Sequence, residues 1–322
     1  MNLLLTYLTP LKYRMLAGFS IKFTGTVMDL FLPWILAYMI DVVVPTGSIN
    51  GILLWGGAMV VCSVIAVLAS IKANRMASSV ARDAVKAIRH DVYEKTTYLS
   101  ASQADRFTAP SLISRLTSDT YNIHRTIGLM QRIGVRAPIL LLGGILMTLT
   151  LDPVLTLVML GVLPFATATV YFISKKGIPL FDSLQQEVDR LVRTVRENIS
   201  GARVIKALSK TAYEKERFDG VNRRVVQAET KANKTIAATT PLMNLFLNSG
   251  LALVILASAY RVNAGLTQPG VVIAFMTYFT IILNSMLSIT RIFVMFSRGI
   301  ASADRIHDIL ATEPELAVKA LD

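Results

Sequence analysis

Six apolar runs constrain this chain more than any other feature, because each is long enough to cross a membrane as a helix. They lie at Ile21–Val44, Ile52–Ile71, Ile127–Leu149, Val154–Ser174, Leu242–Val262 and Val271–Phe296. About 20 helical residues span a hydrocarbon core of about 30 Å. Inside lipid, every backbone N–H and C=O group needs a partner within the protein, which a helix supplies. The sequence therefore predicts an all-α membrane protein with six transmembrane helices.

The distribution of charge predicts how these helices are oriented. The 322-residue chain has a net charge of +12, and its Lys and Arg residues gather in Lys72–Arg136 and Lys175–Lys234. The loops Pro45–Gly51 and Leu151–Pro153 contain neither residue type, and the third such loop has only Arg261 beside it. By the positive-inside rule, both termini and both long segments are expected in the cytoplasm. We therefore interpret the basic excess as a topology signal in a lipid-embedded protein, and we expect no nucleic-acid partner.

The N-terminal segment does not have the pattern of a signal peptide, because it has no compact apolar stretch followed by a small-residue cleavage site. Apolar side chains instead recur there at helical spacing, at Leu4, Leu8, Leu11 and Met15. This pattern predicts an elbow helix lying in the membrane interface over residues 1–17, ahead of a six-span domain over residues 18–310. Cys62 is the only cysteine, so no disulfide can form within the chain.

Two long charged segments separate the apolar runs, and we expect both to form helical hairpins, which we call the arms. The first arm covers residues 73–127. Lys72–Leu99 contains no Pro or Gly, so it can continue the second helix about 40 Å beyond the membrane. Polar residues and Pro110 then interrupt the helix between Leu99 and Leu112, and a return helix is expected from Ser111 to the third span.

The second arm covers residues 175–241 and repeats this plan. Its helix is interrupted at Gly201 and again near Ser209–Thr211, and Tyr213–Ala238 returns toward the membrane. Most apolar residues of the arms are expected to pack arm against arm in one bundle. The end of a bundle has no further helix to contact. The arm ends, which we call the tips, are therefore the candidate docking surfaces for another domain.

Four segments of the chain resemble one family. GARVIKAL followed by YEKERF, and RFTAPSLISRLTSD, resemble the two intracellular loops of ATP-binding-cassette (ABC) exporters. RIGVRAPILLLGG is similar to subunits of bacterial heterodimeric multidrug exporters, and ASADRIHDIL resembles the segment that joins the last span to the nucleotide-binding domain. The resemblance covers almost the whole chain in the family's order. It implies the ABC exporter transmembrane fold, the bacterial cytoplasmic membrane, and a second membrane half in a homodimer or heterodimer.

The resemblance also implies what the tips do, because in that family they are coupling helices that insert into nucleotide-binding domains. By position, the first tip is Ser100–Asp105 and the second is Lys210–Lys215, and the second is implied to cross to the partner subunit's motor. The implied contact residues are Ser102, Gln103, Asp105, Thr211, Tyr213 and Glu214. Ala109–Pro110–Ser111 stands where many members place a Gly, so the turn after the first tip is left unassigned.

The chain has no GxxxxGK[ST] phosphate loop and no Gly-Lys pair, so alone it is not expected to hydrolyse ATP. The resemblance implies that ATP and Mg²⁺ bind to a nucleotide-binding domain outside this sequence, with residues 311–322 as the start of the linker, and that the full-length protein hydrolyses ATP. We expect no cofactor, metal or catalytic residue in this chain itself. His90, His124 and His307 are far apart and show no metal-ligand spacing.

Polar residues within the apolar runs are candidates for a substrate pathway. Asp29 shares a helical face with Lys22 and Thr26. Either Asp29 pairs with a neighbouring helix while Lys22 extends to the interface, or Asp29 lines a water-filled cavity that attracts cationic substrates. The fifth and sixth runs carry further candidates, Asn244, Asn248, Thr280, Asn284, Ser288 and Arg291. For these residues, hydrogen bonding between helices is the alternative to a pathway role.

These observations favour the transmembrane domain of an ATP-driven exporter, and the resemblance alone implies a small amphiphilic drug or lipid as its substrate. An ion-coupled secondary transporter with Asp29 as its proton site would explain the intramembrane carboxylate but not the arms. A non-transporting scaffold or sensor would explain arms that bind a cytosolic partner, and it predicts no cavity between the spans.

Overall fold

The computed structural model describes residues 2–313, apart from the side chains of Asn2, Val170, Thr290, Arg291, Phe293, Val294 and Ser297. Every regular element in this range is helical, and six helices are long and apolar enough to cross a membrane. This confirms the predicted all-α class and the predicted number of spans. The chain divides into two compact units, unit 1 with Met1–Thr156 and Val254–Asp322, and unit 2 with Leu157–Leu253.

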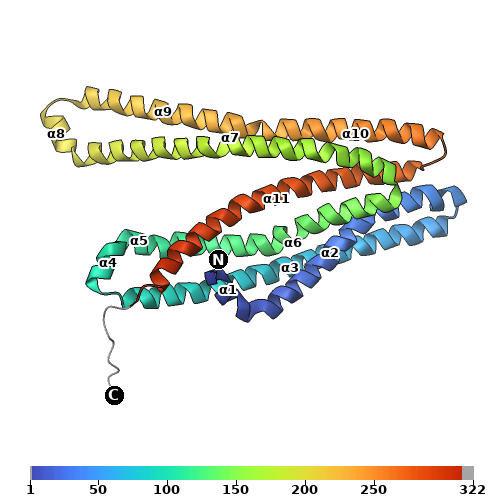
Figure 1. Ribbon diagram of the computed structural model, residues 1–322, viewed down its shortest axis with the longest axis horizontal. Coiled ribbons are helices and arrows are strands. Elements are labelled where there is room, and N and C mark those ends of the chain that lie inside the picture. The colour runs from blue at the N-terminus through green and yellow to red at the C-terminus, as the bar shows by residue number, and fades with distance from the viewer. Residues whose placement is uncertain (1, 314–322) are drawn as a thin grey trace, which may run out of the picture. The chain divides into compact units, whose positions relative to one another are not determined.

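The long helices α2, α3, α6 and α11 pack alongside one another in unit 1 (Figure 1). In chain order the elements of this unit are α1 (Asn2–Leu8), η1 (Thr9–Leu11), α2 (Lys12–Tyr38), η2 (Met39–Val43), η3 (Val44–Thr46), α3 (Ile49–Thr97), α4 (Ala101–Phe107), α5 (Ala109–Ser114), η4 (Arg115–Asp119), α6 (Thr120–Leu151), the start of α7 (Pro153–Ser200), the end of α10 (Thr239–Asn263) and α11 (Pro269–Leu310).

Helix α3 continues without a break from the second apolar run into the first arm. Gly47, with a φ of 68°, lets the chain turn before the helix, and the hydroxyl of Ser48 caps its start by accepting a hydrogen bond from the N–H of Gly51 (3.2 Å). The 49 residues that follow contain no proline, and the helix ends at Thr97. The span and the descending half of the arm are therefore one rigid element.

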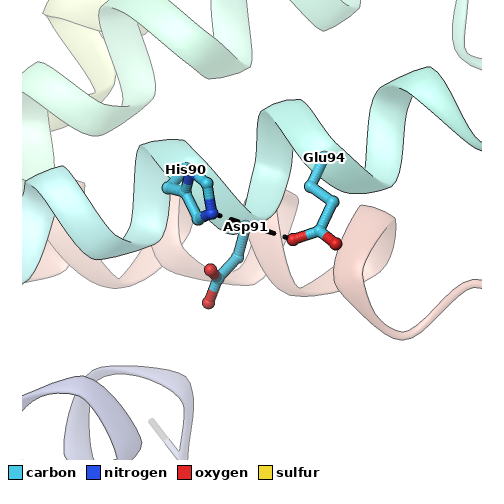
Figure 2. Close-up of side chains that lie close together, drawn as sticks. All are labelled: His90, Asp91 and Glu94. Atoms are coloured by element: carbon cyan, nitrogen blue, oxygen red, sulfur yellow. Dashed lines mark ion pairs between the residues drawn. The ribbon is translucent and has the colours of Figure 1, made fainter.

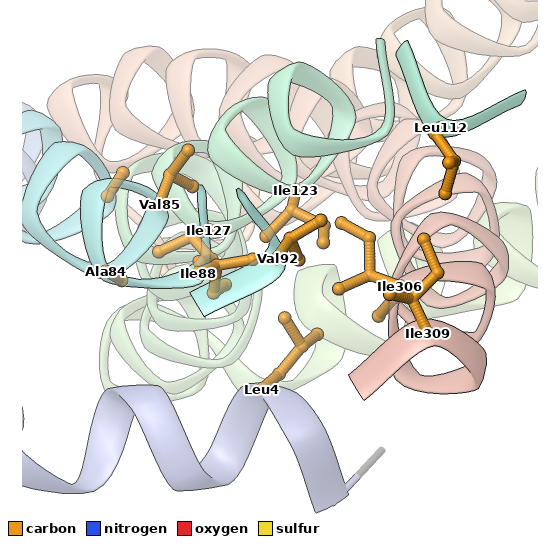
Figure 3. Packing of buried hydrophobic residues seen from close by; sticks show 12 residues of the cluster. Leu4, Ala84, Val85, Ile88, Val92, Leu112, Ile123, Ile127, Ile306 and Ile309 are labelled. Carbon is orange, nitrogen blue, oxygen red and sulfur yellow. The ribbon is translucent and has the colours of Figure 1, made fainter. Parts of the chain in front are cut away.

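The first arm has its own hydrophobic core, to which five helices contribute (Figure 3). Val85, Ile88 and Val92 face inward at helical spacing on α3, and Ile306 and Ile309 face them from α11. Other buried members are Leu4 from α1, Leu112 from α5, and Ile123 and Ile127 from α6. Apart from Ile127, the first residue of the third apolar run, this core lies beyond the predicted spans, so the arm is stabilised by burial of apolar surface within the protein rather than by lipid.

The N-terminal segment differs from the prediction. Helix α1 ends at Leu8, and after η1 a new helix begins already at Lys12. Leu4 is buried in the core of the first arm, and the Tyr7 hydroxyl donates a hydrogen bond to Asp91 Oδ2 (2.5 Å). Asp91 lies roughly 30 Å along α3 from the end of the predicted second span. The apolar stripe that was expected to face the membrane interface is therefore covered by the arm.

Two π-helical turns each place an aspartate at one end of α11. In η2, Asp41 accepts hydrogen bonds from the N–H groups of Gly270 (2.6 Å) and Val271 (3.0 Å), in the first turn of α11. A Cβ atom at Gly270 would lie 2.7 Å from the Asp41 carboxylate, so the close approach requires glycine. At the end of η4, Asp119 accepts a hydrogen bond from Arg305 Nε (3.0 Å), near the other end of α11. Helix α11 is thus held at both ends.

Unit 2 contains an antiparallel hairpin in which α7 runs beside α9 (Thr211–Ala237) and α10, joined through α8 (Ala202–Ala207) (Figure 1). Ion pairs follow its length. Arg217 contacts Glu197, and Arg224 Nε lies 3.4 Å from Glu187 Oε2. Few side chains of α9 are buried, and the residues of these ion pairs other than Glu187 are solvent-exposed, so the pairs stabilise the hairpin only weakly.

Candidate functional site

The first tip consists of the short helices α4 and α5. Ser100 and Gln103 form a capping box at the start of α4: Ser100 Oγ accepts a hydrogen bond from the Gln103 N–H (3.2 Å), and Gln103 Oε1 accepts one from the Ser100 N–H (3.1 Å). Thr108 separates the two helices with a φ of 63°, and Pro110 stands in the first turn of α5. The turn that the sequence left unassigned therefore lies at Thr108.

The structure separates the three predicted contact residues of the first tip. Ser102 and Asp105 are exposed on α4. Gln103 is buried, and its Nε2 donates a hydrogen bond to the backbone oxygen of Glu313 (2.7 Å), in addition to the capping box. Gln103 therefore does not present its side chain to a partner but fixes the segment that follows α11 against the tip. Its predicted role as a docking contact is corrected to a positioning role.

We expect Ser100→Ala to destabilise the first tip by about 1 kcal/mol, because the substitution removes the capping oxygen and leaves the Gln103 N–H without its acceptor. Hydrogen–deuterium exchange measures the effect as faster exchange of the α4 amides. Ser102→Ala is the matched control, because Ser102 is exposed on the same helix. Equal exchange rates in the two variants would contradict a stabilising role for the cap.

The second tip is located differently from the prediction. Its short helix is α8, whereas Thr211–Lys215 forms the first turn of the long helix α9. Ser209, with a positive φ of 52°, lies in the break between the two helices. The sequence indicated both interruptions, at Gly201 and near Ser209, but not which of the intervening segments forms the short helix. The predicted segment Lys210–Lys215 is thus the N-cap and first turn of the return helix and not a separate helix.

The predicted residues of the second tip remain at the end of the arm. Thr211 is exposed, and 63% of the Tyr213 side chain is exposed, which is a large amount for an aromatic residue. Glu214 is mostly covered and forms an ion pair with Arg217 (3.2 Å). Tyr213 therefore offers an exposed aromatic surface to a partner at this tip, as Val204 and Leu208 offer exposed aliphatic ones.

Within the spans of unit 1, Asp29 forms an ion pair with the neighbouring helix. Arg136 Nη2 on α6 donates a hydrogen bond to Asp29 Oδ2 (2.9 Å), which is the first of the two alternatives for this carboxylate. Lys22 differs from the prediction, because it does not extend to the interface. It is 4% exposed, and its Nζ donates hydrogen bonds to Ser70 Oγ (2.9 Å) and Asn74 Oδ1 (3.2 Å) on α3.

A cavity of about 340 Å³ lies between α6 and α11 beside this ion pair. Arg136 lines it, together with two of the predicted pathway residues, Asn284 and Ser288. Thr280 is not among the lining residues, and its hydroxyl donates a hydrogen bond to the carbonyl of Met276 (3.0 Å) within α11. The structure therefore brings a guanidinium, an amide and a hydroxyl to one cavity, which can bind a polar group by charge and hydrogen bonds.

The remaining pathway candidates lie elsewhere. Asn244 and Asn248 are on an exposed face of α10 in unit 2. The side chain of Arg291 lies outside the described residues. Their role in a pathway stays a prediction.

Sequence reasoning missed Asp152, whose carboxylate accepts four hydrogen bonds. Asp152 Oδ1 accepts hydrogen bonds from the N–H groups of Val154 (2.9 Å) and Leu155 (3.2 Å) and so caps α7. Asp152 Oδ2 accepts one from Arg261 Nε (2.9 Å) and another from the hydroxyl of Thr267. The Asp-Pro pair after an apolar run is a local helix-start signal, but nothing in the sequence indicates the two distant partners.

The charge of Asp152 is set by these contacts. Burial alone raises the pKa of this carboxyl group, but hydrogen bonds from Thr267, Leu155, Arg261 and Val154 lower it by more, so the pKa of Asp152 lies below its usual value. A lowered pKa means that the ionised form is favoured by folding. The contribution of Asp152 to stability is therefore present above the usual carboxyl pKa and is lost as the pH falls through the lowered pKa.

One cluster of possible metal ligands was not anticipated from the sequence. His90, Asp91 and Glu94 lie on one turn of α3 with ligand atoms within 4.8 Å of one another (Figure 2). His90 and Glu94 are highly exposed, with His90 Nε2 3.9 Å from Glu94 Oε2, and Asp91 accepts the hydrogen bond of Tyr7. An exposed pair four residues apart on a helix is an ordinary surface arrangement. The cluster is therefore no basis for a metal site.

Comparison with known proteins identifies relatives over almost the whole chain. A family model described as the ABC transporter transmembrane region matches residues 15–286. The chain is 28% identical over 311 residues to YfiB of Bacillus subtilis, described as an uncharacterized ABC transporter ATP-binding protein, covering 96% of this chain and 54% of that protein. It is 28% identical over 314 residues to Rv1273c of Mycobacterium tuberculosis, with the same description, covering 98% and 54%. The chain spans about half the length of these curated relatives.

Proposed function

The chain belongs to the ABC transporter transmembrane region family, and on that premise we propose that it forms one membrane-spanning half of an ATP-driven exporter of small amphiphiles. It is a multi-pass membrane protein with six apolar helices of spanning length. In this proposal two such halves enclose the pathway in the cytoplasmic membrane, with both termini and both tips on the cytoplasmic side. Nucleotide-binding domains dock on the tips in this proposal. ATP and Mg²⁺ bind to those domains, since this chain contains no phosphate loop.

The exposed tips are the observation that carries the proposal. Ser102 and Asp105 are exposed on α4, the short helix that follows the end of the spanning helix α3. Tyr213 is exposed at the start of α9, which belongs to the same spanning segment as α10. An exposed aromatic side chain beside charged neighbours has the composition of a protein interface. A motor that moved these tips would move the spans with them, since a continuous helix transmits displacement along its length.

The pathway in this proposal includes the cavity lined by Arg136, Asn284 and Ser288. Movement of the tips would change the packing of α6 and α11 and so open the cavity first to one side of the membrane and then to the other. Asp29 does not serve as the driving proton site in this proposal, because Arg136 occupies its carboxylate.

We expect Tyr213→Ala/Glu214→Ala to reduce substrate-stimulated ATP hydrolysis and transport several-fold in the full-length protein, because the variant removes the exposed aromatic side chain of the second tip. The measurement is ATP-dependent uptake of a fluorescent amphiphile into inverted membrane vesicles, with ATP hydrolysis recorded in parallel.

Val226→Ala/Glu229→Ala is the matched control, because both residues are exposed on the same helix away from the tip. It is expected to retain the activity of the unmodified protein. Equal activity in the two variants would rule out the assignment of the second tip. Transport driven by a pH gradient without ATP would contradict the proposed function itself.

A further inference from the structure

A second cavity in unit 1 is lined by basic side chains from two helices. It is an open depression between α3 and α6 with a volume of about 600 Å³, and the side chain of Arg82 in its lining is 71% exposed. Its charged and hydroxyl-bearing lining residues are Arg75, Ser78, Ser79 and Arg82 from α3, with His124 and Arg132 from α6. The lining includes no acidic residue within the part of the chain that the structure describes. We call this space the basic cavity.

The positive charge of the basic cavity is only partly compensated. Arg82 Nε lies 3.1 Å from Asp83 Oδ1, but the same carboxylate also pairs with Arg14 (2.8 Å). No described side chain forms an ion pair with Arg75 or Arg132. Asp83 is therefore shared by Arg14 and Arg82, while Arg75 and Arg132 have no described carboxylate partner. The positive charge of these two guanidinium groups would attract an anion that enters the cavity.

The position of Arg132 is built into α6 rather than left to a mobile side chain. Its Nε donates a hydrogen bond to the carbonyl of Gly128, one turn earlier (3.0 Å), which leaves the remaining N–H groups of the guanidinium for another acceptor. A Cβ atom at residue 128 would lie 3.0 Å from Arg132 Nη2, so glycine provides the room for this conformation. The guanidinium fork is thus held beside the cavity before any ligand arrives.

The positive-inside rule alone does not explain this arrangement. That rule places Lys and Arg near the cytoplasmic ends of spans, but it does not require them to converge on a cavity or to be buried. Lys22 is 4% exposed next to the basic cavity, since it donates to Asn74, a lining residue, and its other partner, Ser70, is also uncharged. No described carboxylate accepts a hydrogen bond from Lys22, and the nearby Asp29 is already paired with Arg136, so a further anion would compensate the buried amine.

We propose that the basic cavity binds the phosphate-bearing head of an anionic amphiphile, which is the substrate class of the transporter. Binding of the head group does not depend on the proposed export function. Only the identification of the bound amphiphile as the transported substrate rests on that function. Guanidinium groups bind phosphate through paired hydrogen bonds, and the two serine hydroxyls can donate to further phosphate oxygens. The cavity lies where the second apolar run ends and the third begins, which is the depth of lipid head groups. A ligand held there by its head can keep its tail in the hydrocarbon core.

Arg136 lies one turn beyond Arg132 on α6, but it does not extend the basic cavity. It lines the cavity shared with Asn284 and Ser288, and it is already paired with Asp29 (2.9 Å). The uncompensated positive charge therefore lies at the basic cavity.

The test measures binding to the full-length protein without ATP. The probe is phosphatidylglycerol with a fluorescent acyl chain, followed by fluorescence anisotropy in detergent, and phosphatidylcholine with the same label is the neutral comparison. We expect phosphatidylglycerol to bind at least about tenfold more tightly than phosphatidylcholine, and Arg75→Gln/Arg132→Gln to remove at least about tenfold of that affinity. Arg75→Lys/Arg132→Lys keeps the charges and is expected to lose less.

Lys86→Gln/Arg125→Gln is the matched control, because it removes two exposed cations from the same two helices outside both cavities. Its affinity is expected to remain within about twofold of the unmodified protein. Equal binding of the two lipids, or equal loss in the test and control variants, would overturn the proposal. If inorganic pyrophosphate displaces the lipid at matched concentration, the cavity binds a free phosphate compound. That result would overturn the proposal that its ligand is an amphiphile. If Arg75→Gln/Arg132→Gln does not fold, the lipid affinities of Arg75→Lys/Arg132→Lys and of each single substitution are compared with that of the unmodified protein instead. Failure of ATP-dependent transport leaves this binding result intact, so the two proposals fail separately.

Discussion

Replacing Asp152 with alanine is expected to lower the stability of the protein by about 3 kcal/mol. Asp152 is 2% exposed and accepts hydrogen bonds from two backbone N–H groups, a guanidinium and a hydroxyl. Alanine removes the cap of α7 and leaves the charge of Arg261, itself 20% exposed, without its partner. Thermal unfolding in detergent, followed by circular dichroism, should show a markedly lower midpoint for the variant.

Asp182→Ala is the matched control, since Asp182 is an exposed aspartate on the same helix α7. It is expected to unfold like the unmodified protein. The pH dependence provides a second check. Because the pKa of Asp152 is lowered in the folded protein, the stability difference between Asp152→Ala and the unmodified protein should be full above about pH 4 and shrink on further acidification. A difference that is small at neutral pH, or that grows in acid, would contradict this account.

Asp119→Ala is expected to destabilise unit 1 by about 2 kcal/mol. The Asp119 side chain is 4% exposed and receives two hydrogen bonds from Arg305, whose side chain is 49% exposed. The exposure of Arg305 lets water solvate the cation once its partner is gone, so the expected loss is smaller than at Asp152. The same unfolding measurement applies, with hydrogen–deuterium exchange over Ser302–Leu310 to localise the change.

Asp308→Ala serves as the comparison, because Asp308 is an exposed aspartate on the same stretch of α11. A double-mutant cycle with Arg305→Ala separates the ion pair from other effects. If the pair carries the stability, the double variant should lose less than the two single variants added together. Strict additivity of the two losses would show that the contact between Asp119 and Arg305 contributes little.

The spans and the first tip could be predicted from the sequence because their signals are local. A run without charges requires no knowledge of its neighbours, and the structure has a helix of spanning length at each of the six runs. The interruption expected between Leu99 and Leu112 contains the break before α4 and the turn at Thr108, since Ser, Thr and Pro disfavour helix through their own backbone contacts. Two of the pathway candidates, Asn284 and Ser288, do line one cavity.

The networks that hold the elements together could not be predicted, because their partners are remote in sequence. Asp152 and Arg261 are 109 residues apart, Gln103 and Glu313 are 210 apart, and Asp41 and Val271 are 230 apart. Helical periodicity identifies which face of a helix is covered but not what covers it. That is why the apolar stripe of α1 was assigned to lipid, while in the structure it packs on the first arm. It is also why Gln103 was assigned to a partner domain and not to its own chain.

The two aspartates at the ends of α11 have a mechanical consequence. The helix has 42 residues and therefore a length of roughly 60 Å. While Asp41 and Asp119 both keep their partners, the separation between the turns that carry them is fixed by the helix and cannot shorten or lengthen. Rearrangements of unit 1 are then limited to tilting and rotation about these two attachment points, and any sliding of α11 along its axis must first break one of them.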